Sequence, residues 1–70
     1  MSKWTEVRCD FFNEIEQAWF IDAWEDGEEG TVIAKIFNNG NVEYLDDDAR
    51  TDSYAQEIIR NVLADIKENF

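Results

Sequence analysis

Residues 31–45 read TVIAKIFNNGNVEYL, two strand-like runs joined by a short polar segment that contains Asn39 and Gly40. β-Branched and aromatic residues are frequent in both runs, as in a pleated, half-buried strand. An Asn-Gly pair between such runs favours a two-residue hairpin loop, because both central residues of a type I′ turn must adopt positive φ. The sequence therefore predicts antiparallel strands at about 31–37 and 41–45.

The place of this turn also predicts the register of the hairpin. With a two-residue loop, Phe37 pairs with Val42 and Lys35 pairs with Tyr44. One face then carries Ile33, Lys35, Phe37, Val42 and Tyr44, and the other carries Val32, Ala34, Ile36, Glu43 and Leu45. A slip of one residue would move the side chains of one strand to the opposite face, so the register determines which residues reach the core.

Two further strands are predicted upstream of this hairpin, at about 5–12 and 16–24. In the first, apolar and charged residues alternate, with Val7, Cys9 and Phe11 on one side. This is the period of a strand with one buried face. The second run is apolar on both faces near its middle, which indicates a strand at the centre of the sheet.

The last part of the chain has the period of a helix, which we predict at about 52–68. Its apolar stripe consists of Tyr54, Ile58, Val62 and Ile66, flanked by Ala55, Ile59 and Leu63. Such a stripe is typical of a helix that packs one side against a core. Thr51, Asp52 and Ser53 are all residue types that cap a helix N-terminus well, so any of the three can start it.

These elements predict an α+β fold in a single domain over residues 1–70. A four-stranded antiparallel β-meander is followed by one C-terminal amphipathic helix packed on one sheet face, giving a two-layer sandwich. The uncovered face is then the unusual feature, since Phe12, Phe20 and Trp24 fall on the parity opposite to Trp19. Either Trp4 and the loops fold over this face, or it is an exposed apolar patch of the kind that marks an interface.

The charge of the chain restricts its partners. Seventeen acidic residues face six basic ones, with no histidine, and the formal net charge is −11. Binding to nucleic acid or to an anionic membrane needs a basic surface, so we expect neither as a direct partner. Only Cys9 is a cysteine, no apolar run approaches the roughly 18 residues of a membrane span, and no signal-peptide pattern is present. We therefore expect a cytoplasmic protein.

Catalysis and cofactor binding find little support among these residues. Without histidine the chain lacks the usual general base near neutral pH, and Cys9 lies on the apolar side of a predicted strand. A 70-residue sandwich also leaves little volume for a substrate cleft. We therefore expect a protein that is not an enzyme and that carries no cofactor.

A calcium loop counted from Asp46 places Asp48, Asp52 and Glu57 at ligand positions. However, Thr51 occupies the position where the loop needs glycine for its sharp turn. The acids therefore favour a solvated connection between sheet and helix. Weak divalent-metal binding is retained as the third of three functional hypotheses.

The first functional hypothesis is a small acidic interaction module that binds a protein through the apolar sheet face, with Phe20 and Trp24 as candidate contact residues. Self-association into a homodimer is one form of it. The second hypothesis is an acidic nucleic-acid mimic that inhibits a basic DNA- or RNA-binding protein, and in size and charge the chain resembles small acidic inhibitors encoded by phages and mobile elements. Its candidate residues are Glu25, Asp26, Glu28, Glu29, Asp46, Asp47 and Asp48.

Overall fold

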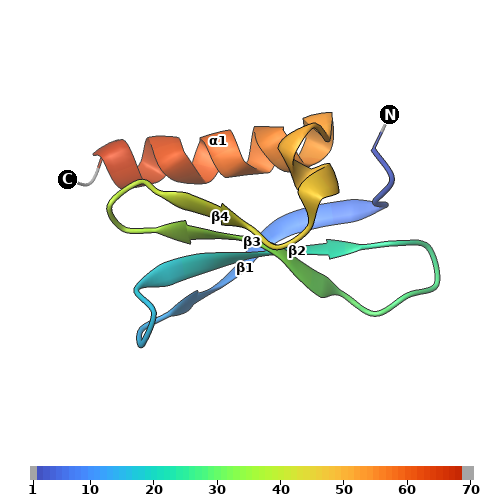
Figure 1. Ribbon diagram of the computed structural model, residues 1–70, viewed down its shortest axis with the longest axis horizontal. Coiled ribbons are helices and arrows are strands. Elements are labelled where there is room, and N and C mark those ends of the chain that lie inside the picture. Colours follow the sequence, from blue (N-terminus) through green and yellow to red (C-terminus); the bar gives the residue numbers. More distant parts are fainter. Residues whose placement is uncertain (1, 69–70) are drawn as a thin grey trace.

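The computed structural model describes residues 2–68, which form an α+β fold with one sheet and one long helix (Figure 1). The elements are β1 (Glu6–Asn13), β2 (Ala18–Trp24), β3 (Thr31–Phe37), β4 (Val42–Tyr44), the 3₁₀ helix η1 (Asp47–Arg50) and α1 (Ser53–Glu68). The strands are antiparallel and lie in the order β1-β2-β3-β4. The predicted meander followed by a C-terminal helix is thus confirmed.

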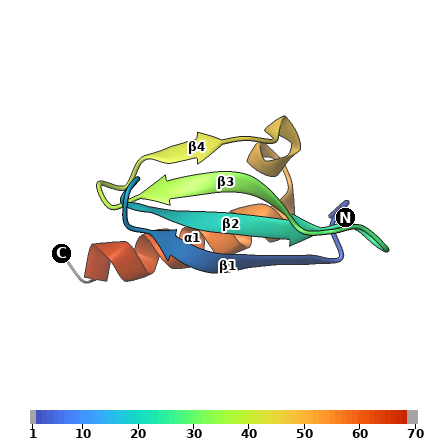
Figure 2. The same cartoon turned by 90° about the horizontal axis from the view of Figure 1, so that it is seen from below.

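Helix α1 lies across one face of the sheet, and no helix of residues 2–68 lies on the opposite face (Figures 1 and 2). We call these the helix face and the outer face. The element bounds differ from the predicted ones by one or two residues. The largest difference is at β2, where Gln17 has φ 56° and belongs to the preceding turn. The positive φ takes the chain out of the extended conformation, so the strand begins only at Ala18.

The β3–β4 turn differs from the predicted one. The Phe37 N–H donates to the Asn41 carbonyl at 2.8 Å, and the Gly40 N–H donates to the Phe37 carbonyl at 2.9 Å. Residues 38–40 are therefore a three-residue loop, and Gly40 alone among them has positive φ, at 90°. This is the geometry of a turn that ends in a glycine bulge, in which Asn39 needs no positive φ.

The predicted register of this hairpin is consequently wrong by one residue. Ile36 pairs with Val42, and Ala34 pairs with Tyr44. The larger loop moves β4 along β3, so the side chains of these four residues point to the helix face, and Lys35 points to the outer face. An Asn-Gly pair is compatible with both loop lengths, which is why the turn residues alone indicated the wrong one.

Two β-bulges shift the alternation of the strands. On β1, Cys9 pairs with Ile21 and Phe11 pairs with Phe20, so Asp10 is an extra residue. The bulge sends Phe11 to the outer face and Phe12 to the helix face, the reverse of the predicted sides.

The second bulge lies on β3 and enlarges the core. Ile21 pairs with Ala34 and Asp22 pairs with Val32, so Ile33 has no partner on β2. Ile33 and Ala34 are both fully buried, because the extra residue lets two successive side chains face the core. The Ile33 carbonyl accepts from the N–H groups of Leu45 (2.9 Å) and Asp46 (3.2 Å) and thereby holds the end of β4.

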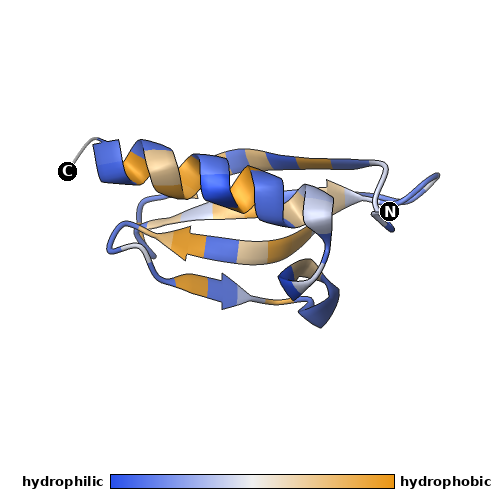
Figure 3. Ribbon diagram, turned by 90° about the horizontal axis from the view of Figure 1, so that it is seen from above, coloured by the Kyte–Doolittle hydropathy of each residue, from blue (hydrophilic) through white to orange (hydrophobic). Residues whose placement is uncertain are grey.

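The core lies between α1 and the helix face. Its largest fully buried side chains are Ile21, Ile33, Ile36 and Ile59. Along α1 the apolar residues recur at helical spacing (Figure 3). Ala55 and Ile59 are buried and Ile58 and Val62 are half-buried beside them, so the predicted stripe packs against the sheet through its flank. Trp4, 6% exposed, joins the same core and does not fold over the outer face.

Asp52 caps the helix. Its carboxylate accepts from the Ala55 N–H and from the Ser2 hydroxyl, each at 2.9 Å. Burial alone would raise the pKa of Asp52, but these hydrogen bonds outweigh it and lower the pKa below its ordinary value. Of the three residues suited to the cap, Asp52 therefore performs it and also ties the N-terminal segment to α1.

Candidate functional site

The outer face is not covered by any helix of the described residues 2–68 (Figure 2), and it carries aromatic side chains. Ile21 and Ala23 are buried on the helix face, so the alternating Phe20 and Trp24 point outward. The Phe11 ring packs against Phe20 with 4.7 Å between ring centroids and is 45% exposed. The predicted contact residues Phe20 and Trp24 thus lie together on one face, and the bulge adds Phe11 to them.

Two cations lie on these rings. The Arg8 guanidinium lies 4.5 Å from the centroid of Trp24, and the Lys35 ammonium lies 5.0 Å from that of Phe20. Lys35 is also bonded to Glu16 at 2.7 Å, and this hydrogen bond raises the pKa of Lys35. Both cations are attracted to the negative faces of the rings, so the outer face combines apolar area with positive charge in an otherwise acidic protein.

Trp24 is a fixed wall of the outer face. Its ring is in close contact with Gly30, where an added Cβ would lie 2.4 Å from Cε2. The ring is therefore held between the Gly30 backbone and the Arg8 guanidinium. The main-chain carbonyl of Trp24 accepts a hydrogen bond from the Thr5 N–H at 2.7 Å. Glycine at position 30 leaves room for the indole, which a Cβ at this position would displace.

A carboxyl group lies between the rings. Asp22 points outward from β2 between Phe20 and Trp24, and its buried Oδ1 has no hydrogen-bond partner. Burial is the main cause that raises the pKa of Asp22, and Asp10 raises it further through a hydrogen bond and its charge, against the opposing effect of Arg8. The Oδ1 of Asp22 therefore accepts no hydrogen bond from residues 2–68.

The two predicted acidic segments meet at a second site, which we call the acidic end. The Lys3 ammonium lies 2.9 Å from the Asp48 carboxylate and 3.7 Å from those of Asp46 and Glu25. The hydrogen bond to Asp48 is the main cause that raises the pKa of Lys3. Both segments lie toward the end of the molecule that carries the N-terminus (Figure 1).

The other predicted acids belong to the same end. A pocket between the two segments is lined by Trp4, Glu28 and Glu29 together with Glu25 and Asp46. Asp47 lies in η1, with its carboxylate 3.5 Å from Arg50, and Asp26 is an exposed residue of the β2–β3 loop. The topology therefore gathers two charge runs that are about 20 residues apart in the sequence.

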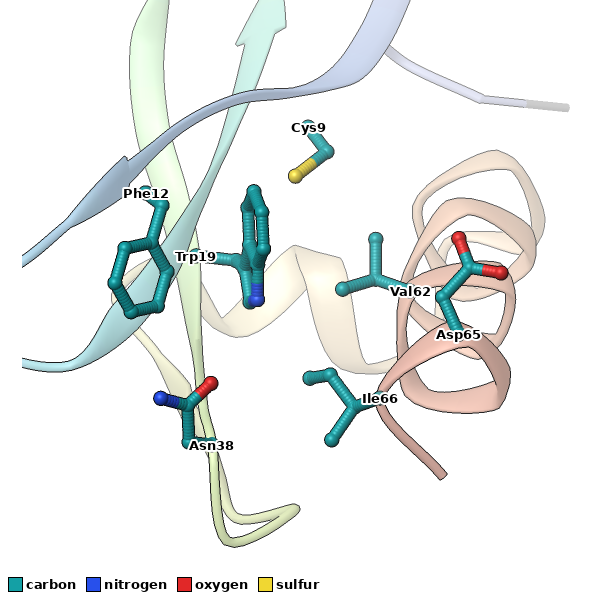
Figure 4. A pocket seen from close by; sticks show the side chains of 7 residues that line it. All are labelled: Cys9, Phe12, Trp19, Asn38, Val62, Asp65 and Ile66. Atoms are coloured by element: carbon teal, nitrogen blue, oxygen red, sulfur yellow. The ribbon is translucent and has the colours of Figure 1, made fainter. Parts of the chain in front are cut away.

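A third feature, which the sequence did not indicate, is a groove between α1 and the sheet. Its volume is about 420 Å³, and its lining is mainly apolar (Figure 4). The lining residues are Cys9, Phe12, Trp19, Asn38, Val62, Asp65 and Ile66. The β1 bulge makes this groove, because it turns Phe12 toward the helix face.

Comparisons with known proteins leave these surfaces as the basis for a functional assignment. No protein-family model, no curated protein and no solved structure matches the chain. Within residues 2–68, no three or more cysteine, aspartate or glutamate side chains are grouped so as to hold a metal ion. No helix in that range has the length and hydropathy needed to cross a membrane.

Proposed function

We propose that this chain is a non-enzymatic protein-interaction module that binds through the outer face of its sheet, with a second copy of the chain as the partner. The aromatic cluster of Phe11, Phe20 and Trp24 on a face without a covering layer carries this proposal. Exposed apolar area of this kind is stabilised by burial against a partner. Trp24 is held by Gly30 and Arg8, so little side-chain entropy is lost at this position on binding.

A second copy fits because the outer face carries both signs of charge. A two-fold interface sets the same patch against itself, so a basic and an acidic residue on one face can pair reciprocally across it. Arg8 supplies the basic residue, and Asp22 supplies the acidic one on the same face.

Sedimentation velocity over a wide concentration range tests the proposal. We expect a concentration-dependent dimer that persists or strengthens at high salt, since apolar association is not screened. Phe11→Ser should abolish the dimer. Ile15→Ser should not, because Ile15, which is 95% exposed, lies in the β1–β2 turn and not on a strand of the outer face. A wild-type monomer at every concentration, or equal loss in both variants, would refute the proposal.

A second candidate function is supported by the acidic end. Acids from two segments meet there around Lys3 and a shared pocket, and a mimic of phosphate charges needs such a concentration of carboxylates. Such a surface would capture a basic nucleic-acid-binding protein by long-range attraction, which salt screens beyond about 8 Å at physiological ionic strength.

The test of this second candidate is a pull-down from the cognate lysate, eluted along a salt gradient. We expect release of a basic protein at moderate salt, and loss of that protein when Glu28 and Glu29 are changed to glutamine. The matched control changes Glu14 and Glu57, two acids outside the acidic end. Equal capture by both variants, or a partner retained at high salt, would argue against mimicry.

A further inference from the structure

The groove between α1 and the sheet has the size and the walls of a small-molecule site. Phe12 and Trp19 form one wall, with their ring centroids 4.8 Å apart, and Val62 and Ile66 form the other (Figure 4). Its volume of about 420 Å³ lies in the usual range of ligand pockets. An aromatic ring placed between these walls would be in contact with apolar side chains on both sides.

The polar groups at the groove are mainly acceptors. The carboxylate of Asp65 lies on the helix side and the amide of Asn38 on the sheet side (Figure 4). The Nδ2 of Asn38 donates to Gln17 at 3.1 Å, which leaves its Oδ1 as the group turned to the groove. Among the described residues, none that lines the groove is basic, and Lys67 lines the adjoining pocket that shares Asn38 and Ile66 with it.

The thiol of Cys9, which lines the groove, also lies near negatively charged side chains. Burial is the main cause that raises the pKa of this thiol, and three nearby carboxylates raise it further. These carboxylates are those of Asp10, Asp22 and Asp65. Asp65 lines the groove, whereas Asp22 points to the outer face, so a ligand that enters the groove meets an apolar interior with the Asp65 carboxylate beside it.

We propose that this groove binds a small organic cation in which an aromatic ring is joined by a short linker to a protonated amine. The ring lies between Phe12, Trp19 and Val62, and the ammonium lies at the helix side of the mouth, near the Asp65 carboxylate. Anionic ligands of the same shape are excluded by the surrounding carboxylates and by the net charge of −11. The proposal is independent of association through the outer face.

A matched pair of ligands tests the proposed charge preference. Tryptamine and indole-3-propionate have the same ring and the same linker but opposite charges. Titration followed by amide chemical shifts in the full chain should show tryptamine binding at least about tenfold more tightly, with shifts centred on residues 62–66 and on Asn38. Equal affinities, or shifts centred elsewhere, would overturn the proposal.

Two variants that each remove one carboxylate test whether the preference for tryptamine arises at this groove. Asp65→Asn should reduce the preference for tryptamine by about threefold to tenfold, the effect of one unit charge at about 6 Å in water on ligands of opposite sign. Glu57→Gln removes the same charge from an exposed position of α1 away from the groove and should leave the preference unchanged. Equal effects of the two variants would mean that only net charge acts, which contradicts the proposal.

The Cys9 thiol supplies a second readout that needs no bound ligand. A cationic and an anionic methanethiosulfonate reagent, aminoethyl and sulfonatoethyl, are compared at low salt for their rates of reaction with Cys9, relative to a free thiol. The cationic reagent should be favoured, and tryptamine should slow it by occupying the groove. Rates that are insensitive to reagent charge, or unaffected by saturating tryptamine, would overturn the proposal.

Discussion

Gly30→Ala tests how the outer face is held in place. In the native chain the φ of Gly30 lies outside the left-handed region, so alanine adds no backbone strain there. The new Cβ would lie 2.4 Å from Cε2 and 2.5 Å from Nε1 of Trp24. Carbon atoms in ordinary contact are about 3.5 to 4.0 Å apart, so the indole must move by more than 1 Å.

The cost follows from what the indole loses when it moves. Overpacking of this kind costs about 1 to 3 kcal/mol, and the contact of Arg8 with the Trp24 ring contributes about 0.5 to 1 kcal/mol at a partly exposed site. We expect the free energy of unfolding to fall by about 2 kcal/mol. For a chain of 70 residues the total is about 4 to 10 kcal/mol, so this is a large fraction.

Urea unfolding monitored by circular dichroism measures this change. With a slope of about 1 kcal/mol per molar urea, typical of a small domain, the midpoint should fall by about 2 M. A double-mutant cycle with Trp24→Ala isolates the contact, since Gly30→Ala should cost little once the indole is gone. The reasoning is refuted if Gly30→Ala costs the same in both backgrounds.

Three further predictions concern single side chains. Asp22→Asn should raise the melting temperature at pH 7. The native pKa of Asp22 is raised above 3.8, so ionisation of this carboxyl lowers the stability of the wild type as pH rises through the native pKa. The difference in melting temperature between variant and wild type should therefore vanish well below pH 3.8. Asp52→Ala should lower the free energy of unfolding by about 1 kcal/mol near neutral pH, because the helix loses its cap. The native pKa of Asp52 is lowered, so this difference should shrink as acid protonates the wild-type carboxylate below about pH 3.8. Urea melts at a series of pH values measure the difference. Ile59→Ala should cost about 2 to 5 kcal/mol and Ile58→Ala clearly less, since only the former is fully buried, and equal costs in thermal melts would contradict the packing of α1.

The element types and their order could be predicted because strand and helix periods differ strongly in this chain. The register of the hairpin could not, because Asn39-Gly40 fits both a two-residue and a three-residue loop. The sides of the strand residues could not be predicted throughout either, because each bulge adds one residue without a signal in the sequence. Phe11 and Phe12 show this well: two adjacent phenylalanines fit either parity, and only the pairing of Cys9 with Ile21 and of Phe11 with Phe20 reveals the extra residue Asp10. The aromatic outer face was expected from Phe20 and Trp24, whereas the contribution of Phe11 was not.

The candidate sites were predictable to the degree that they depend on local sequence. The two acidic segments were evident from composition, but their meeting around Lys3 depends on the path of the whole chain. The same holds for the groove, whose walls come from β1, β2 and the last turns of α1. A side chain such as Trp19 carries no local signal that it faces a groove and not a closed core.

The bulge at Asp10 has a consequence for the edges of the sheet. β1 is an outer strand, and a free edge invites a strand of another molecule to add to it, which leads to aggregation. The bulge interrupts the row of free backbone groups, and the charged Arg8 and Asp10 flank the interruption. β4, the other outer strand, is only three residues long. Both features oppose ordered growth of the sheet by strand addition at its edges.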